Sequence, residues 1–264
     1  MSIWARIFTG ASWFSVDGPI GGLARQIWTA ASDIVAGPDG AELDDDPRAA
    51  TQQLAFTMAA IALGAKMAKA DGQVTDEEVA AFSELFHVPP REQKNMARVF
   101  RIAQQSVAGY ESYARQVAKL FEHHPPVLEE LLDALFHIAV ADGVIHPDEM
   151  DYLYNVAGIF GLDSAAFARV KAVNIDGRDA DPYEILGADR GMPSDQLRKL
   201  YLELIRLHHP DRLIAEGAPP EFVALANEKL AAINAAYENI TGNNGEPSSG
   251  QNSSRSTTSR STGR

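Results

Sequence analysis

The chain contains no cysteine, and this absence removes several kinds of chemistry at once. Without thiols it has no disulfide framework, no thiolate nucleophile and no cysteine-ligated zinc site. Cations are also outnumbered: 23 Lys and Arg residues face 36 Asp and Glu residues, which gives a formal net charge of −13. Because nucleic-acid binding needs clustered Lys and Arg to contact the phosphates, we expect no nucleic-acid partner.

The sequence also lacks the motifs of the common enzyme classes. It has no His-Glu-x-x-His zinc motif, no serine nucleophile elbow and no glycine-rich phosphate loop followed by Lys. His123 and His124 stand directly before Pro125 and Pro126, a pattern that indicates the end of a helix rather than a metal site. We expect a protein that is not an enzyme and that needs no cofactor.

No window of about 20 residues is free of charge within residues 1–43, which hold all three tryptophans. Asp17, Arg25 and Asp33 interrupt the apolar positions, and each would cost roughly 2.5–3.5 kcal/mol at the centre of a bilayer. A spanning helix is therefore unfavourable, and two alternatives remain: a helix docked on its own protein, or an amphipathic anchor on a membrane surface. We expect a cytoplasmic protein, with peripheral contact with the inner membrane left open.

What the sequence does contain is helical periodicity, which predicts an all-α fold. With 264 residues, 45% of them apolar, the chain is long enough for one large or two small domains. The pattern is helical throughout residues 51–173, turn formers mark a boundary at residues 176–182, and a second helical unit follows over residues 181–241. Residues 242–264 contain no aliphatic or aromatic side chain, which predicts a disordered tail.

Residues 69–79 (KADGQVTDEEV) and 140–150 (VADGVIHPDEM) form an internal repeat, 71 residues apart. Each copy lies between two apolar helical stretches, and its Ala-Asp-Gly suits the end of one helix before the start of the next. The carboxylates of these turns are also weak candidates for a divalent-cation site, although the calcium-loop spacing of the EF-hand is not met. The candidate ligands are Asp71, Glu78, Asp142 and Glu149. Structural capping and weak metal binding both remain open.

This paired turn resembles the hallmark of TerB-like helical domains, which are named for tellurite-resistance proteins. The matching pairs are Asp71 with Glu77 and Asp142 with Asp148, and Glu78 and Glu149 stand directly behind them. The resemblance covers about residues 51–173. It implies a helical bundle, with carboxylate-assisted binding of a metal or a partner as a weaker expectation.

The second helical unit carries the start and stop signals of three helices. Asp181 caps a short first helix that ends near Gly187, and Ser194 is expected to cap a second helix. The second helix must stop near His208, because Pro210 has no amide to donate and shifts the residue before it away from helical angles. A third helix follows and is expected to start near residues 219–220 and to run to about residue 240.

The second and third helices of this unit carry matching apolar stripes. The stripe of the second helix consists of Leu197, Leu200, Tyr201, Leu204 and Leu207. The stripe of the third helix consists of Phe222, Leu225, Ala226, Leu230, Ile233 and Tyr237. Two stripes of similar length joined by a loop predict an antiparallel helical hairpin, with His209-Pro210-Asp211 at its tip.

This unit resembles the J domain of DnaJ-type co-chaperones. The segment YEILG (183–187) opens it, SDQLRKLYLELIRLHHPDR (194–212) supplies the second helix and the signature loop, and INAAYENI (233–240) closes the third helix. The insert between the second and third helices, and the TerB-like unit that precedes the J domain, narrow the resemblance to the DjlA-like branch of the family.

The resemblance implies docking on the ATP-bound state of a DnaK-type chaperone and stimulation of its ATP hydrolysis. Exposed cations of the second helix would steer the encounter, and the His-Pro-Asp triplet would enter the contact. The implied docking residues are Arg198, Lys199, Arg206, His209, Pro210, Asp211 and Arg212.

Leu202 and Glu203 depart from the family, since J domains often carry a basic pair at these positions. The J region is also net acidic, so we expect weaker docking than is usual for the family. The TerB-like unit would then recognise client proteins, another partner or a stress signal. The alternative is a TerB-type scaffold or metal-responsive stress protein with an incidental J domain. The oligomeric state is not predicted.

Overall fold

The computed structural model describes residues 47–67, 76–90, 93–94 and 110–243. Its helices are α3 (Pro47–Met67), α4 (Asp76–Leu85), α6 (Tyr110–Leu120), α7 (Pro125–Ala139), α8 (Pro147–Phe160), α9 (Ser164–Lys171), α10 (Pro182–Leu186), α11 (Ser194–Leu207), α12 (Pro210–Ala215) and α13 (Val223–Asn243). Three short helical turns, Ala172–Asp176, Gly177–Asp179 and Pro220–Phe222, connect them. The described segments contain no strand, and the predicted all-α fold is confirmed.

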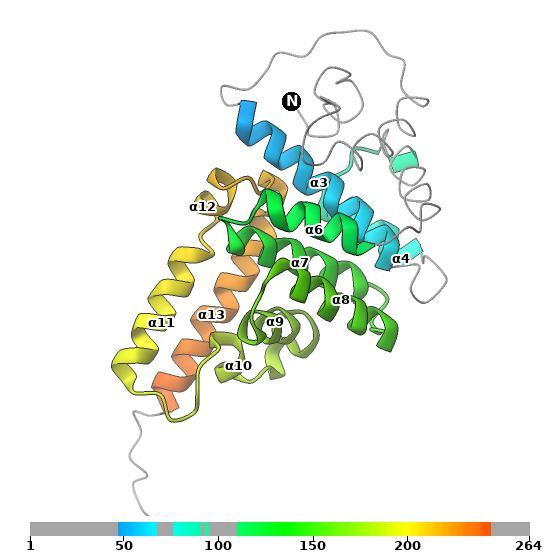
Figure 1. Cartoon of the computed structure of the whole chain (residues 1–264). Coiled ribbons are helices and arrows are strands. Elements are labelled where there is room, and N and C mark those ends of the chain that lie inside the picture. The colour runs from blue at the N-terminus through cyan, green and yellow to red at the C-terminus, as the bar shows by residue number, and fades with distance from the viewer. Residues whose placement is uncertain (1–46, 68–75, 91–92, 95–109, 244–264) are drawn as a thin grey trace, which may run out of the picture.

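Helix α7 is the central element of the first helical unit (Figure 1). It contacts α3, α4, α8 and α9, and it also contacts α13 from the C-terminal unit. Its sequence PPVLEELLDALFHIA is apolar around most of its circumference, and nearly every one of its residues is buried. A helix of this kind must be covered on all sides, which explains why the other helices surround it.

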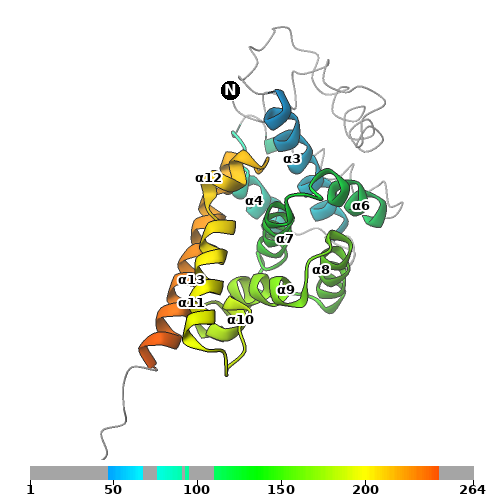
Figure 2. The ribbon, with the colours of Figure 1, turned by 60° about the vertical axis from the view of Figure 1, so that its left-hand side comes forward.

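Helices α11 and α13 run side by side along the edge of this bundle, and α10 packs at one end of the pair (Figure 2). Leu197 and Leu204 of α11 and Ile233 of α13 are buried in a small core between these helices. Tyr201 stacks on Tyr237, with ring centroids 4.2 Å apart. The predicted antiparallel hairpin is present.

The predicted start and end of the first helix of this unit agree with the structure. Asp181 caps α10 by accepting a hydrogen bond from the Tyr183 amide at 3.0 Å, and Gly187 ends α10 with a left-handed backbone, φ 64°. The predicted cap at Ser194 is wrong. Pro193 occupies the N-cap position of α11 with φ −58° and ψ 145°, so Ser194 is already inside the helix. The fixed φ of proline provides this entry geometry without a side-chain cap.

The apolar stripe of α13 does not face a single core, which corrects the simple hairpin prediction. Leu230, Ile233 and Tyr237 pack in the small core of the hairpin. Phe222, at the end of the turn before α13, belongs instead to the core of the bundle, together with the first turn of α13. The stripe is therefore divided between two cores, and its first part joins the hairpin to the bundle.

Several predictions fall on parts of the chain outside the described residues. They concern the anchor segment 1–43, Asp71 and the tail, except that α13 continues through residues 242 and 243. No helix within the described segments is long and apolar enough to cross a membrane.

Candidate functional site

The His-Pro-Asp triplet forms the junction between α11 and α12. Helix α11 ends at Leu207, and Pro210 is the first residue of α12, where its missing amide costs no hydrogen bond. His209 takes the N-cap position of α12 with an extended backbone, and its Nδ1 accepts a hydrogen bond from the Asp211 amide at 3.3 Å. The sequence predicted only a helix stop here. The structure shows that the same residues also start the next helix.

The exposed residues of this turn lie between two buried ones. The His209 side chain is 52% exposed and the Asp211 side chain is 91% exposed. On either side of them, His208 is 1% exposed and Leu213 is 2% exposed. The turn therefore presents an imidazole and a carboxylate to solvent while both of its ends are held in the protein interior.

The predicted cations divide into two groups. Arg198, Lys199 and Arg206 are exposed on α11. Arg212 lies one residue beyond the triplet, and its Nε donates to Glu216 Oε1 at 2.7 Å, so this guanidinium is already engaged within α12. Leu202 is 52% exposed in the same stretch of α11 as the three cations.

Behind the turn, aromatic side chains tie the connection between α12 and α13 to the bundle. The Phe222 ring contacts Phe56 of α3, with centroids 4.7 Å apart, and Phe86, with centroids 5.0 Å apart. Both contacts have the edge-to-face geometry that aromatic pairs favour. The insert that distinguishes this J-like unit is therefore part of the core of the bundle.

A cluster of buried charges forms a second contact between α13 and the bundle. Lys229 of α13 has no solvent exposure, and its Nζ lies 2.9 Å from Glu130 Oε2 and 2.9 Å from Asp133 Oδ2 of α7. Glu129 Oε1 lies 3.0 Å from Arg169 Nε and 3.6 Å from His208 Nε2. The cluster thus links α7 and α9 to α13 and to the last residue before the His-Pro-Asp triplet.

Burial and neighbouring charges shift the pKa values in this cluster in opposite directions. Burial raises the pKa of Glu130 to about 7, with the Lys229 ammonium opposing the shift and the Asp133 carboxylate adding to it. Burial lowers the pKa of His208 to about 4, although the Glu129 carboxylate opposes this. Glu130 is therefore partly protonated at pH 7, whereas His208 is neutral.

Glu129 and Lys229 remain charged at pH 7. Burial by itself raises the pKa of Glu129, but the positive charges of His208, which is protonated only at low pH, and of Arg169 and Lys229 outweigh burial and hold this pKa at about 2. Burial by itself lowers the pKa of Lys229, but the carboxylates around it, led by Asp133, hold this pKa above its usual value. Paired charges of this kind are stable inside a protein only while every partner is present.

Sequence reasoning missed this cluster. Lys229 stands in the polar-looking stretch ANEKLAA, and its partner Glu130 is 99 residues away in the sequence. The signal that was present lies in α7, where Glu129, Glu130 and Asp133 interrupt a helix that is otherwise apolar on every side. Carboxylates on such a helix have no solvent-facing side to occupy, so they require buried partners.

The candidate metal ligands of the second repeat serve the backbone. Asp142 Oδ1 accepts from the Val144 amide at 2.9 Å, and buried Glu149 accepts from the His146 amide at 2.9 Å, just before α8. In the first repeat Glu78 is buried at the start of α4, and Asp71 lies outside the described residues. Among the described residues, no group of three or more His, Asp or Glu side chains is arranged to hold a metal ion.

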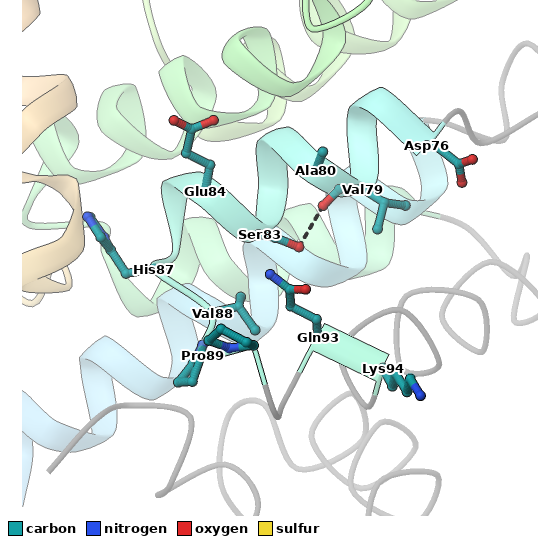
Figure 3. Close-up of a pocket in the computed structure, with 11 residues that line it drawn as sticks. Asp76, Val79, Ala80, Ser83, Glu84, His87, Val88, Pro89, Gln93 and Lys94 are labelled. Atoms are coloured by element: carbon teal, nitrogen blue, oxygen red, sulfur yellow. Dashed lines mark hydrogen bonds between the residues drawn. The ribbon is translucent and has the colours of Figure 1, made fainter.

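An open groove of about 900 Å³ lies along α4 and the turn that follows it (Figure 3). Its polar side chains include Ser83, whose hydroxyl donates to the Val79 carbonyl of the same helix at 2.8 Å. His87 borders the groove with a left-handed backbone, φ 47°. None of the predicted site residues lines this groove, so the turn remains the candidate site.

Comparison with known proteins agrees with this architecture. The family model for tellurite resistance protein TerB matches residues 57–172, so the bundle is a TerB-type helical domain. Proteins named co-chaperone protein DjlA from Aliivibrio fischeri, Vibrio vulnificus (strain YJ016) and Vibrio cholerae are 28%, 28% and 29% identical to the chain. The alignments cover 72%, 78% and 74% of this chain and 78%, 84% and 80% of those proteins. No solved structure gives a significant match.

The chain is therefore a DjlA-like protein, as the order of its two helical units predicted. The relatives are named as co-chaperones, and the similarity supports a DnaJ-type co-chaperone as the class of this protein.

Proposed function

We propose that this protein stimulates ATP hydrolysis by a DnaK-type chaperone through the His-Pro-Asp turn at the start of α12. The observation that carries the proposal is the exposure of His209 and Asp211 between two buried residues. Exposed side chains on a turn that is held at both ends are arranged for contact with a partner rather than for folding. The protein itself performs no chemistry in this proposal and needs no cofactor.

Each residue of the turn has a distinct role in the proposed contact. Pro210 fixes its own φ and gives the turn one geometry. Asp211 offers a carboxylate that accepts a charge-assisted hydrogen bond from a cation of the chaperone. His209 uses Nδ1 to accept from the Asp211 amide, which leaves Nε2 as the ring nitrogen available for the contact. Tighter contact with one state of the chaperone is what would convert binding into stimulation.

The exposed face of α11 supports the same docking. Arg198, Lys199 and Arg206 would attract an acidic surface of the chaperone and raise the rate of encounter. Glu203 is also exposed and weakens this attraction. The TerB-type bundle would bring client proteins or another partner to the complex, and residues 1–43 would supply any peripheral contact with the inner membrane.

The test is single-turnover ATP hydrolysis by the cognate DnaK-type chaperone with the full-length protein. Asp211→Asn removes a charged hydrogen-bond partner, and we expect at least about a 30-fold loss of stimulation, the equivalent of 2 kcal/mol or more. His209→Gln should cause a comparable loss. Asp195→Asn, which changes an exposed carboxylate at the far end of α11, is the matched control and should keep full stimulation. Equal stimulation by all four proteins, or none by the unmodified protein, rejects the proposal.

A further inference from the structure

The turn that carries His209 and Asp211 is held by contacts with the bundle as well as by the hairpin. On its α11 side, His208 lies 3.6 Å from the Glu129 carboxylate of α7. On its α12 side, Leu213 is buried in the same core as Phe56, Phe121 and Phe222. Only one residue separates His208 from Pro210, and only two separate Pro210 from Leu213. A displacement of either buried residue must therefore move the exposed triplet.

A close steric contact also fixes the segment after α12. Gly217 has φ 107°, a conformation that side chains rarely adopt. A Cβ at this position would lie 2.7 Å from the Gln52 Cβ of α3 and 3.1 Å from the Phe121 ring. Because Gln52 Cβ is rigidly attached to its helix, the neighbour cannot yield and the segment itself would have to move. Glycine at this position thus allows the α12 segment to lie directly on the bundle.

A polar contact also lies between the α12 segment and the bundle. Glu216, at the end of α12, places Oε2 3.6 Å from Nδ1 of His124, in the connection between α6 and α7. Its Oε1 accepts from Arg212, so one carboxylate joins the first turn of α12 to the bundle. The α12 segment is therefore held by apolar, steric and polar contacts, all of which come from the TerB-type bundle.

We propose that the TerB-type bundle positions the His-Pro-Asp turn for docking, with Gln52, Phe121 and Glu129 as positioning residues that never touch the chaperone. This inference rests on the proposed function, because it concerns how the same turn acts. The bundle and the J-like hairpin would then form one functional unit in which the bundle keeps the turn in its docking geometry.

The proposal has a quantitative consequence. If only a fraction of the molecules hold the turn in its docking position, the apparent dissociation constant for the chaperone is the intrinsic one divided by that fraction. Fully docked complexes stay unchanged, since the contact residues are intact. Loss of the contacts that hold the α12 segment on the bundle should therefore raise the co-chaperone concentration needed for half-maximal stimulation and leave the maximal rate the same. A variant that lost a contact residue would lower the maximal rate instead.

The experiment uses the full-length chain with two variants and two matched controls. Gly217→Ala is expected to displace the α12 segment from the bundle. Gly191→Ala is its control, because a Cβ at Gly191 meets no atom within 4 Å. Glu129→Gln weakens the contact beside His208, and Glu228→Gln changes an exposed glutamate next to Lys229 on α13. For each protein, hydrogen exchange of residues 208–218 is measured together with the concentration dependence of stimulated ATP hydrolysis. Circular dichroism checks that each variant keeps its helices.

For Gly217→Ala we expect faster exchange in residues 208–218 and about a tenfold higher half-maximal concentration. The tenfold value corresponds to a turn that is held in its docking position in about one molecule in ten. Glu129→Gln should change both readouts in the same direction, and it replaces Gly217→Ala as the decisive variant if the latter loses its helical signal. Faster exchange with an unchanged half-maximal concentration would overturn the proposal, and so would unchanged exchange in both variants. If the unmodified protein gives no stimulation, the proposed function itself fails, while the exchange data still report whether the bundle holds the turn.

Discussion

Two of the contacts that join the hairpin to the bundle differ sharply in chemistry. At one, Phe222 inserts between Phe56 and Phe86. At the other, Lys229 lies among the carboxylates of α7. The first contact is favourable because it removes apolar surface from water, and its strength depends little on its exact partners. The second is favourable only because each buried charge has a partner close by.

This difference assigns the two contacts different roles. Apolar burial holds the hairpin on the bundle across a wide range of conditions. The charge cluster contributes little net stability, because desolvation offsets the attraction, but it allows only one arrangement of α7 and α13. Removal of the Lys229 cation should therefore be far more damaging than a comparable change among the aromatic rings.

The largest expected effect comes from Lys229→Met. This change removes the one cation shared by Glu130 and Asp133 and leaves buried carboxylates uncompensated, so we expect a loss of about 3–5 kcal/mol in the free energy of unfolding at pH 7. Denaturant unfolding followed by circular dichroism measures it. Lys119→Met, at an exposed position near the end of α6, is the control and should change stability by less than about 0.5 kcal/mol. A loss for Lys229→Met no larger than that of the control would show that the cluster does not hold the two parts together.

The second prediction concerns Glu130→Gln. The charge cluster should make the free energy of unfolding depend on pH, whereas the aromatic contact should not. Because its folded pKa of about 7 lies above its ordinary value of 4.5, wild-type Glu130 contributes stability that is fully present below pH 4.5. That contribution is lost as the pH rises from 4.5 through 7, with a slope of at most about 1.4 kcal/mol per pH unit. Glutamine mimics the protonated form and does not titrate. The variant should therefore gain stability relative to the wild type over this window.

Phe222→Leu is the matched comparison for this pH series, since it alters the apolar contact alone. It should lower stability by about 1–2 kcal/mol, because it removes part of a buried ring and its edge-to-face contacts, and by the same amount at every pH. Denaturant unfolding at pH 4.5, 5.5, 6.5 and 7.5 gives both curves. A stability difference for Glu130→Gln that is as flat as that for Phe222→Leu would mean that Glu130 does not take up a proton near neutral pH.

Sequence reasoning predicted the elements set by local rules and missed those set by distant partners. Asp181, Gly187 and Pro210 act within a few residues of themselves, and their predicted roles in starting and ending helices are confirmed. Phe222 was assigned to the hairpin because its spacing matches the α13 stripe, but periodicity shows which face is apolar and not which core it enters. Sequence analysis did not single out Lys229, because its partners belong to α7, far away in the sequence. The contacts that hold the His-Pro-Asp turn on the bundle also come from distant parts of the sequence. Only the exposed residues of the turn were therefore predictable.

The smallest effect is expected on the outward face of α11, which neither contact with the bundle reaches. Glu203 is exposed there, on the helix that carries Arg198, Lys199 and Arg206. Charges at the rim of an interface act mainly on the rate of association, and salt screens them. Glu203→Lys should therefore raise the association rate with the chaperone by a few-fold at low salt, with stability unchanged within about 0.5 kcal/mol.

Stopped-flow binding at two salt concentrations measures this association rate. Glu238→Lys, at an exposed position of α13, is the control for net charge. If both variants speed association equally, the gain comes from total charge and α11 is not the docking face; a gain confined to Glu203→Lys locates the encounter on α11, beside the turn that the bundle holds in place.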